Sequence, residues 1–203
     1  MKLFHAKGSC SLGIIVLIEE LGIECELQVI DLAKGQHHEA DYLAINPKGK
    51  IPALLLDDGE TITEWPAIAT YLAELTPERA FIPEDPRLKA RVYEATDFLV
   101  ATTHMQGFTR IVRPGNFTPT EDDFETVKAR GLEIFEEGLR AMDKVLADNQ
   151  YLIGEISIAD CALFYCEAWM VTRLGGPLPT NCKAHFERML ARPTVAQAML
   201  RAG

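Results

Sequence analysis

The chain has 203 residues, of which 48% are hydrophobic, so it can bury a substantial core as one large domain or two small ones. Its formal net charge is −10, and no cluster of Lys and Arg forms a basic stripe, so nucleic acid is not an expected partner. No stretch approaches the run of about eighteen apolar residues that would span a membrane. The first ten residues lack the apolar segment of a signal peptide, and we therefore expect a cytoplasmic protein.

The five cysteines are too few and too scattered for a disulfide framework. They are Cys10, Cys25, Cys161, Cys166 and Cys182. Cys161 and Cys166 fall in an apolar helical stretch, and we interpret both as small buried hydrophobic residues. No cysteine or histidine spacing is typical of a metal site, so we expect no metal.

The first third of the chain alternates between strand and helix patterns. Alternating apolar and polar residues predict strands, whereas apolar residues at helical spacing that end at Gly22 predict a helix. Asp58-Gly59 is typical of a hairpin turn, and Pro66 suits the first turn of a helix. The predicted segments are a strand at 2–6, a helix at 12–21, a strand at 24–32, a weak helix at 38–43, strands at 51–57 and 60–63, and a helix at 66–75. This order predicts a thioredoxin-like α/β domain with a mixed sheet.

Residues 76–86 hold three prolines and are typical of a linker between domains. Every later segment has helical periodicity, and Ser157 with Asp160 forms a pattern that caps the start of a helix. The predicted helices are 88–112, 124–146, 158–174 and 183–191, followed by a short helix that begins near Pro193. We therefore predict an α/β domain at 1–78 and an all-α domain at 87–203.

A lone cysteine, Cys10, lies between Ser9 and Ser11 where the first strand leads into the first helix. A helix N-terminus carries unpaired N–H groups and a partial positive charge, which stabilise a thiolate. We therefore expect a lowered pKa and a functional thiol, with the two serines as additional donors. The alternative is a buried structural cysteine, the commonest role of a free cysteine. The position of Cys10 ahead of the apolar face favours the functional interpretation.

Two further positions could hold a peptide-like ligand. A cis bond between Ile51 and Pro52 would turn the Ile51 backbone outward to pair with an extended ligand, whereas a trans proline would only begin the strand. Glu64 precedes a helix N-terminus, so it could bind an ammonium group while the helix end binds a carboxylate. The alternative for Glu64 is a solvated residue that interacts with the helix dipole, and spacing alone favours that alternative.

A lone histidine, His104, lies within the first long helix of the second domain. A histidine in a helix is more often a packed or surface residue than a catalytic one. It gains a functional interpretation only if its helix faces Cys10.

Five segments occur in order and in register across essentially the whole chain: GSCSL, NPKGKIPALLLDDG, TEWPAIATYLAE, SIADCALF and RPTVAQAM. Together they closely resemble the glutathione S-transferase family, and most strongly its bacterial beta class, whose signature is a cysteine at this early position. The resemblance implies a glutathione-binding thioredoxin-like domain followed by an all-helical domain that contributes a hydrophobic electrophile site. It also implies glutathione as co-substrate and a homodimer.

The resemblance implies roles for individual residues as well. Cys10 would contact the glutathione sulfur, and His104 would lie near that sulfur, as the two catalytic residues. The residues implied in glutathione binding are Ser9, Ser11, Lys34, Lys50, Ile51, Pro52, Glu64, Trp65 and Asp97. The apolar residues that would line the electrophile site are Phe108, Ile111, Val112, Phe117 and Trp169.

The chain departs from the family pattern at several of these places. Trp65 stands where the family usually has Ser or Gly, so a hydroxyl for the γ-glutamyl carboxylate is missing and only the backbone N–H of Trp65 remains. Asp97 stands where an Asn would reach glutathione across the dimer, and an ionised carboxylate there would weaken the binding of an anionic ligand. His5 and Met105 replace a common Tyr and a common Lys. These departures concern affinity and substrate more than fold.

We therefore predict a glutathione transferase that activates the glutathione thiol at the N-terminus of the first helix and conjugates it to hydrophobic electrophiles. Thiol–disulfide exchange through Cys10 is a possible further reaction. The Ser-Cys-Ser sequence is also similar to zeta-class maleylacetoacetate isomerases, in which glutathione adds reversibly to a double bond. A third hypothesis is a non-catalytic module that binds glutathione or an apolar ligand.

Overall fold

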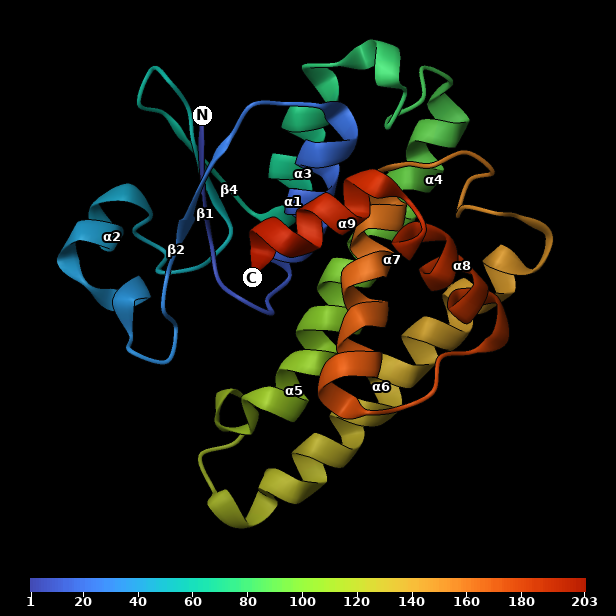
Figure 1. Ribbon diagram of the computed structural model, residues 1–203. Coiled ribbons are helices and arrows are strands. Elements are labelled where there is room, and N and C mark those ends of the chain that lie inside the picture. Colours follow the sequence, from blue (N-terminus) through green and yellow to red (C-terminus); the bar gives the residue numbers. More distant parts are fainter. The chain divides into compact units, whose positions relative to one another are not determined.

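The computed structural model describes residues 1–203 (Figure 1). Its contacts divide the chain into two compact units, the first formed by Met1–Ile82 with Arg188–Gly203 and the second by Pro83–Glu187. None of the helices has the length and apolar character that a membrane crossing requires. By their contacts, residues 188–203 group with the first unit, although the sequence assigns them to the helical domain.

The first unit contains a four-stranded mixed sheet. Its strands are β1 (Lys2–His5), β2 (Glu26–Val29), β3 (Ala53–Leu55) and β4 (Thr61–Thr63), in the order β2-β1-β3-β4. β1 pairs parallel to β2 and antiparallel to β3, and β3 pairs antiparallel to β4. A parallel β1–β2 pair needs a helical crossover, whereas the Asp58-Gly59 turn suffices between β3 and β4. The predicted thioredoxin-like order is therefore confirmed.

Three helices of the first unit come from its N-terminal part, namely α1 (Ser11–Leu21), α2 (Ala40–Ile45) and α3 (Trp65–Glu74). Figure 1 shows α2 on one side of the sheet and α1 with α3 on the other. Because side chains alternate along β1, Phe4 faces α2, and its ring meets the Tyr42 ring edge-on at 5.7 Å. Leu3 points the opposite way and is fully buried. Nearly every residue of α1 is buried, which explains its almost uninterrupted apolar sequence.

The last helix of the chain, α9 (Pro193–Ala202), packs against α1 within the first unit. Val195 and Ala198 of α9 are fully buried. Arg192 donates to the buried carboxylate of Glu20 at 2.7 Å, and Thr194 donates to the same carboxylate. An apolar seam and a paired carboxylate therefore fix α9 to the first unit.

The second unit is helical. Its elements are α4 (Pro86–Asp97), the π-helical segment η3 (Phe98–Phe108), α5 (Thr109–Val112), α6 (Phe124–Val145), α7 (Ile158–Trp169), the short π-helical segment η7 (Met170–Leu174) and most of α8 (Thr180–Leu190). The predicted helices at 88–112, 124–146 and 158–174 are present. The π geometry of 98–108 was not predicted, because widened turns leave no clear mark in apolar spacing.

Glycines allow α6 to approach the η3–α5 segment closely. A Cβ atom at Gly138 would lie 2.2 Å from the Thr103 hydroxyl oxygen, and one at Gly131 would lie 2.6 Å from Cβ of Arg110. A Cβ atom at Gly107, on the facing helix, would lie 2.9 Å from the Phe135 backbone nitrogen. Any larger residue at these positions would push the two helices apart.

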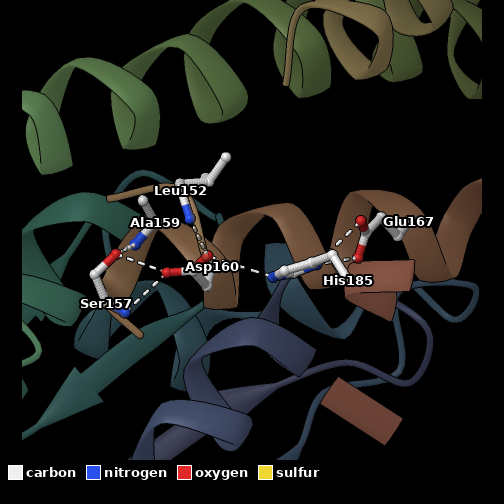
Figure 2. Close-up of polar contacts among 6 residues, drawn as sticks. All are labelled: Leu152, Ser157, Ala159, Asp160, Glu167 and His185. Carbon is white, nitrogen blue, oxygen red and sulfur yellow. Dashed lines mark hydrogen bonds and ion pairs between the residues drawn. The ribbon is translucent and has the colours of Figure 1, made fainter. Parts of the chain in front are cut away.

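A buried polar cluster anchors the start of α7 (Figure 2). The Ser157 side chain accepts from the Ala159 amide at 3.3 Å, and the Asp160 carboxylate accepts from the Ser157 amide at 2.8 Å. The predicted cap at Ser157 and Asp160 is therefore confirmed as a capping box. Asp160 also accepts from the Leu152 amide at 2.9 Å, so the cap holds the preceding loop as well.

Candidate active site

Cys10 occupies the N-cap position of α1, where the sequence predicts it. Only 7% of its surface is exposed, and its side chain makes no capping hydrogen bond. The turn before it contains Gly8 at a φ of 64°, a left-handed conformation that suits glycine. The Ser9 hydroxyl contacts the Ala6 carbonyl at 2.7 Å and the Ser11 hydroxyl at 2.9 Å. The two serines therefore stiffen the turn that carries Cys10.

Burial raises the pKa of the Cys10 thiol to about 12, and the lowering effect of its own backbone amide is smaller. The expectation that the helix N-terminus lowers this pKa is therefore wrong. The reason is desolvation: the thiolate loses hydration in the interior, and the partial charge of the helix end does not replace it. Cys10 is a neutral S–H donor at neutral pH.

The Ile51–Pro52 peptide bond is cis, as one of the two sequence interpretations requires. Pro52 is buried and Ile51 is half-buried just before β3. The preceding Lys50 carbonyl accepts hydrogen bonds from the Tyr42 hydroxyl at 2.5 Å and from the Asn46 side chain at 2.7 Å. These two bonds fix the backbone that leads into the cis bond, while the Lys50 side chain is exposed.

Glu64 is the N-cap of α3 and has a φ of 72°, which is unusual for a residue with a side chain. Its exposed carboxylate pairs with the Lys48 ammonium at 2.7 Å, and Lys48 also donates to the Thr63 hydroxyl at 2.8 Å. Sequence reasoning missed Lys48, although it lies inside the NPKG segment. Lys34, by contrast, is exposed and pairs with its neighbour Asp31 at 3.4 Å.

Trp65 is 97% buried, and its indole N–H donates to the Cys10 carbonyl at 3.0 Å. This bond joins the first turn of α3 to the N-cap of α1, two places that are 55 residues apart in sequence. The structure therefore brings Cys10 and the Glu64–Trp65 pair together. The indole bond was not predicted, because the sequence shows Trp65 only as the loss of a hydroxyl.

The second unit holds the other predicted catalytic residue, His104, within η3. Its Nδ1 atom lies 3.4 Å from the Tyr165 hydroxyl, and its ring meets the edge of Trp169 at 4.8 Å. Burial lowers the pKa of His104 to about 4, and the nearby positive charge of Arg113 adds to this. The imidazole is therefore neutral at neutral pH, so one ring nitrogen can donate a hydrogen bond and the other can accept one.

The residues predicted for the electrophile site differ in exposure. Phe108 and Trp169 are buried and stack on each other at 4.0 Å. Phe117 is half-buried beneath the Arg110 guanidinium, which lies 4.1 Å from its ring centre. Ile111 is half-buried and Val112 is exposed, as is Asp97 at the end of α4. A cavity of about 580 Å³ in this unit lies elsewhere, between α4 and the end of α6.

Two domain models of one protein family match the chain, one in each half. The N-terminal domain model of glutathione S-transferases matches residues 8–75, and the C-terminal domain model matches residues 125–188. Together they cover more than half of the chain. The chain belongs to the glutathione S-transferase family.

Several similar proteins are bacterial. The chain is 35% identical to glutathione S-transferase GstA of Escherichia coli O157:H7, over 98% of this chain and 97% of that protein. A beta-class glutathione S-transferase of Sphingomonas chungbukensis is 33% identical, with a TM-score of 0.84 and coverage of 100% and 99%. A glutathione transferase homologue from Sulfitobacter, solved with bound glutathione, is 28% identical, with a TM-score of 0.88 and coverage of 97% and 95%.

Proposed function

We propose that this glutathione S-transferase conjugates the glutathione thiolate to hydrophobic electrophiles, using Cys10 as a hydrogen-bond donor to the sulfur. The observation that carries the proposal is a buried thiol at the N-cap of α1, where burial raises its pKa. The S–H group and the Cys10 amide can both donate to a ligand thiolate, whereas the amides of Ser11, Leu12 and Gly13 already donate within the turn. Such donors favour the charged form and so lower the pKa of the bound glutathione thiol.

Glutathione would lie along the first unit in an extended form. The Ile51 backbone, next to cis-Pro52, would pair with its cysteinyl residue, and Glu64 with the backbone N–H of Trp65 would bind its γ-glutamyl end. Lys48 belongs to this end too, because its ammonium already pairs with the Glu64 carboxylate at 2.7 Å. Lys34 and Lys50 would lie near the glycyl carboxylate, and the Ser9–Ser11 turn would hold the Cys10 amide that meets the sulfur.

The helical unit would supply the electrophile site and His104. A neutral imidazole can orient the thiol or the electrophile by a hydrogen bond without adding charge. Phe108, Ile111, Val112, Phe117 and Trp169 would give the site its apolar character. We propose a cytoplasmic homodimer in which Asp97 approaches the glutathione of the partner subunit, in a detoxifying role.

Conjugation is favoured over thiol–disulfide exchange through Cys10. Exchange requires the Cys10 thiolate as nucleophile or leaving group. A thiol whose pKa is about 12 is ionised in only about one molecule in 10⁵ at neutral pH. The glutathione thiol, which binds near the helix amides, is therefore the proposed nucleophile.

The experiment compares Cys10→Ala and Cys10→Ser with the unchanged protein, with chlorodinitrobenzene as electrophile. Loss of a hydrogen bond to a charged group costs about 1.5–3 kcal/mol, so Cys10→Ala should lower kcat/KM about 10- to 100-fold. The apparent pKa of its pH–rate profile should rise by about one to two units. Cys10→Ser keeps a donor and should recover part of both effects.

A Cys10→Ala variant with full conjugating and disulfide-reducing activity and unchanged glutathione affinity would overturn this role. Faster turnover of maleylacetoacetate than of chlorodinitrobenzene would favour the isomerase suggested by the Ser-Cys-Ser sequence. No retention on immobilised glutathione together with no turnover would favour a non-catalytic module.

A further inference from the structure

The indole of Trp65 joins the two helix N-termini of the first unit. Its Nε1 donates at 3.0 Å to the carbonyl of Cys10, and both residues are buried. The same carbonyl accepts the Gly13 amide at 3.1 Å, so it takes part in the first turn of α1. Trp65 is itself the first residue of α3, directly after the N-cap Glu64. One side chain therefore fixes the start of α1 relative to the start of α3.

The bond is a specific one. An indole N–H has one direction of donation and no accepting capacity, so it fixes position better than a hydroxyl that rotates freely. A buried donor that loses its acceptor retains a desolvation cost, which keeps the bond closed in the folded state. The Trp65 side chain has two torsions, and burial restricts both. A shift of α3 would therefore move the Cys10 backbone with it.

We propose that Trp65 is a positioning residue of the glutathione site, whose indole N–H holds Cys10 and the α1 amides in register with the γ-glutamyl subsite at Glu64. This inference rests on the proposed function for the identity of the ligand. The distance between the two helix ends sets where a bound tripeptide places its sulfur when its γ-glutamyl end is held. A residue without this donor would leave the γ-glutamyl subsite intact but would loosen the sulfur subsite.

The test uses Trp65→Phe in the 203-residue chain, because phenylalanine keeps an aromatic ring and removes the N–H. The control is Thr194→Val, which removes a side-chain hydrogen bond of the same unit at the opposite end of α1. That end lies about 15 Å from Cys10 along the helix. Thermal unfolding of both variants measures the structural cost of losing one such bond.

Three measurements separate positioning from a general loss of structure. In Trp65→Phe we expect kcat for chlorodinitrobenzene to fall about tenfold, because small displacements of reacting groups are costly. The apparent pKa of the pH–rate profile should rise by about half a unit, which corresponds to about threefold weaker stabilisation of the thiolate. The dissociation constant of S-methylglutathione, which has no thiol to ionise, should change less than about twofold. Thr194→Val should alter none of the three.

An unchanged pH–rate profile in Trp65→Phe would overturn the proposal, as would a loss of S-methylglutathione affinity as large as the loss of kcat. If the unchanged protein neither binds nor turns over glutathione, a measurement that needs no glutathione can still test whether the indole positions Cys10. Alkylation of Cys10 by iodoacetamide, followed by mass spectrometry of the Cys10 peptide, should be at least about threefold faster in Trp65→Phe than in Thr194→Val. Equal rates would show that the indole does not position Cys10.

Discussion

His185 lies in the interior of the second unit, with carboxylates on both sides (Figure 2). Its Nδ1 atom is 2.9 Å from the Glu167 carboxylate, and its Nε2 atom is 3.3 Å from the Asp160 carboxylate. Burial alone would lower the pKa of this imidazole. The negative charges of Glu167 and Asp160 outweigh burial and raise it to about 9. His185 is therefore an imidazolium at neutral pH, and it satisfies two buried acids with one charge.

The stability of the protein should fall with rising pH because of this group. An imidazole whose pKa is raised on folding stabilises the protein fully below its unfolded pKa of 6.5 and loses that contribution as the pH passes about 9. The contribution is about 3 kcal/mol. Urea unfolding at pH 6 and at pH 9.5 should show most of this difference. In His185→Gln the fall in stability between these two pH values should be smaller by this amount, and an equal fall in that variant would assign it to other groups.

Single residues differ in how well the sequence reveals them. Ser157 and Asp160 were predictable, because a capping box is a local pattern of four residues. The position of Cys10 at the start of α1 was also predictable, but its raised pKa was not. Burial depends on residues far away in sequence, and the same is true of the Trp65 bond to the Cys10 carbonyl.

Close helix packing in the second unit depends on Gly138. In an exposed helix, replacing a glycine by alanine stabilises by up to about 1 kcal/mol. Here the added methyl would lie 2.2 Å from the Thr103 hydroxyl, so we expect Gly138→Ala to destabilise the protein by about 1–3 kcal/mol. Denaturant unfolding measures the change. The double variant with Thr103→Ala should recover part of the loss, and stabilisation by Gly138→Ala alone would contradict the packing argument.

At the scale of elements, the order of strands and helices in both parts could be predicted, and their ends could be predicted to within a few residues. Apolar spacing, Gly22, Asp58-Gly59 and the capping residues of α7 are local signals, which is why they suffice. The π-helical geometry of Phe98–Phe108 could not be predicted in this way. The close packing of η3 against α6, where Gly107 and Gly138 let the backbones approach, also involves residues far apart in sequence.

At the scale of the whole molecule, α9 belongs by contact to a unit whose other elements end at Ile82. Arg192, the N-cap of α9, pairs with the buried carboxylate of Glu20, and Arg201 near the end of α9 pairs with Glu19. We expect Arg192→Ala to destabilise the first unit by about 3 kcal/mol, the lower end for a broken buried pair, because the guanidinium is partly exposed. In the Arg192→Ala variant, a further Glu20→Gln change should lower the free energy of unfolding by less than Glu20→Gln does in the unchanged protein.

The two tryptophans allow this prediction to be assigned to one unit. Trp65 lies in the first unit and Trp169 in the second. With Trp169→Phe as background, fluorescence follows the first unit alone, and Arg192→Ala should shift its unfolding midpoint to lower denaturant. An unchanged midpoint would show that the Arg192–Glu20 pair contributes nothing to that unit. Sequence patterns did not reveal the grouping, because a terminal helix has the same periodicity wherever it docks.

The docking of α9 has a consequence for protein synthesis. A nascent chain that has emerged as far as Ile82 holds the whole sheet but leaves the flank of α1 bare. That apolar flank stays uncovered while the ribosome makes every residue of Pro83–Glu187. During translation, the first unit should therefore be the more open to chaperones and proteases, even though it is the first to leave the exit tunnel.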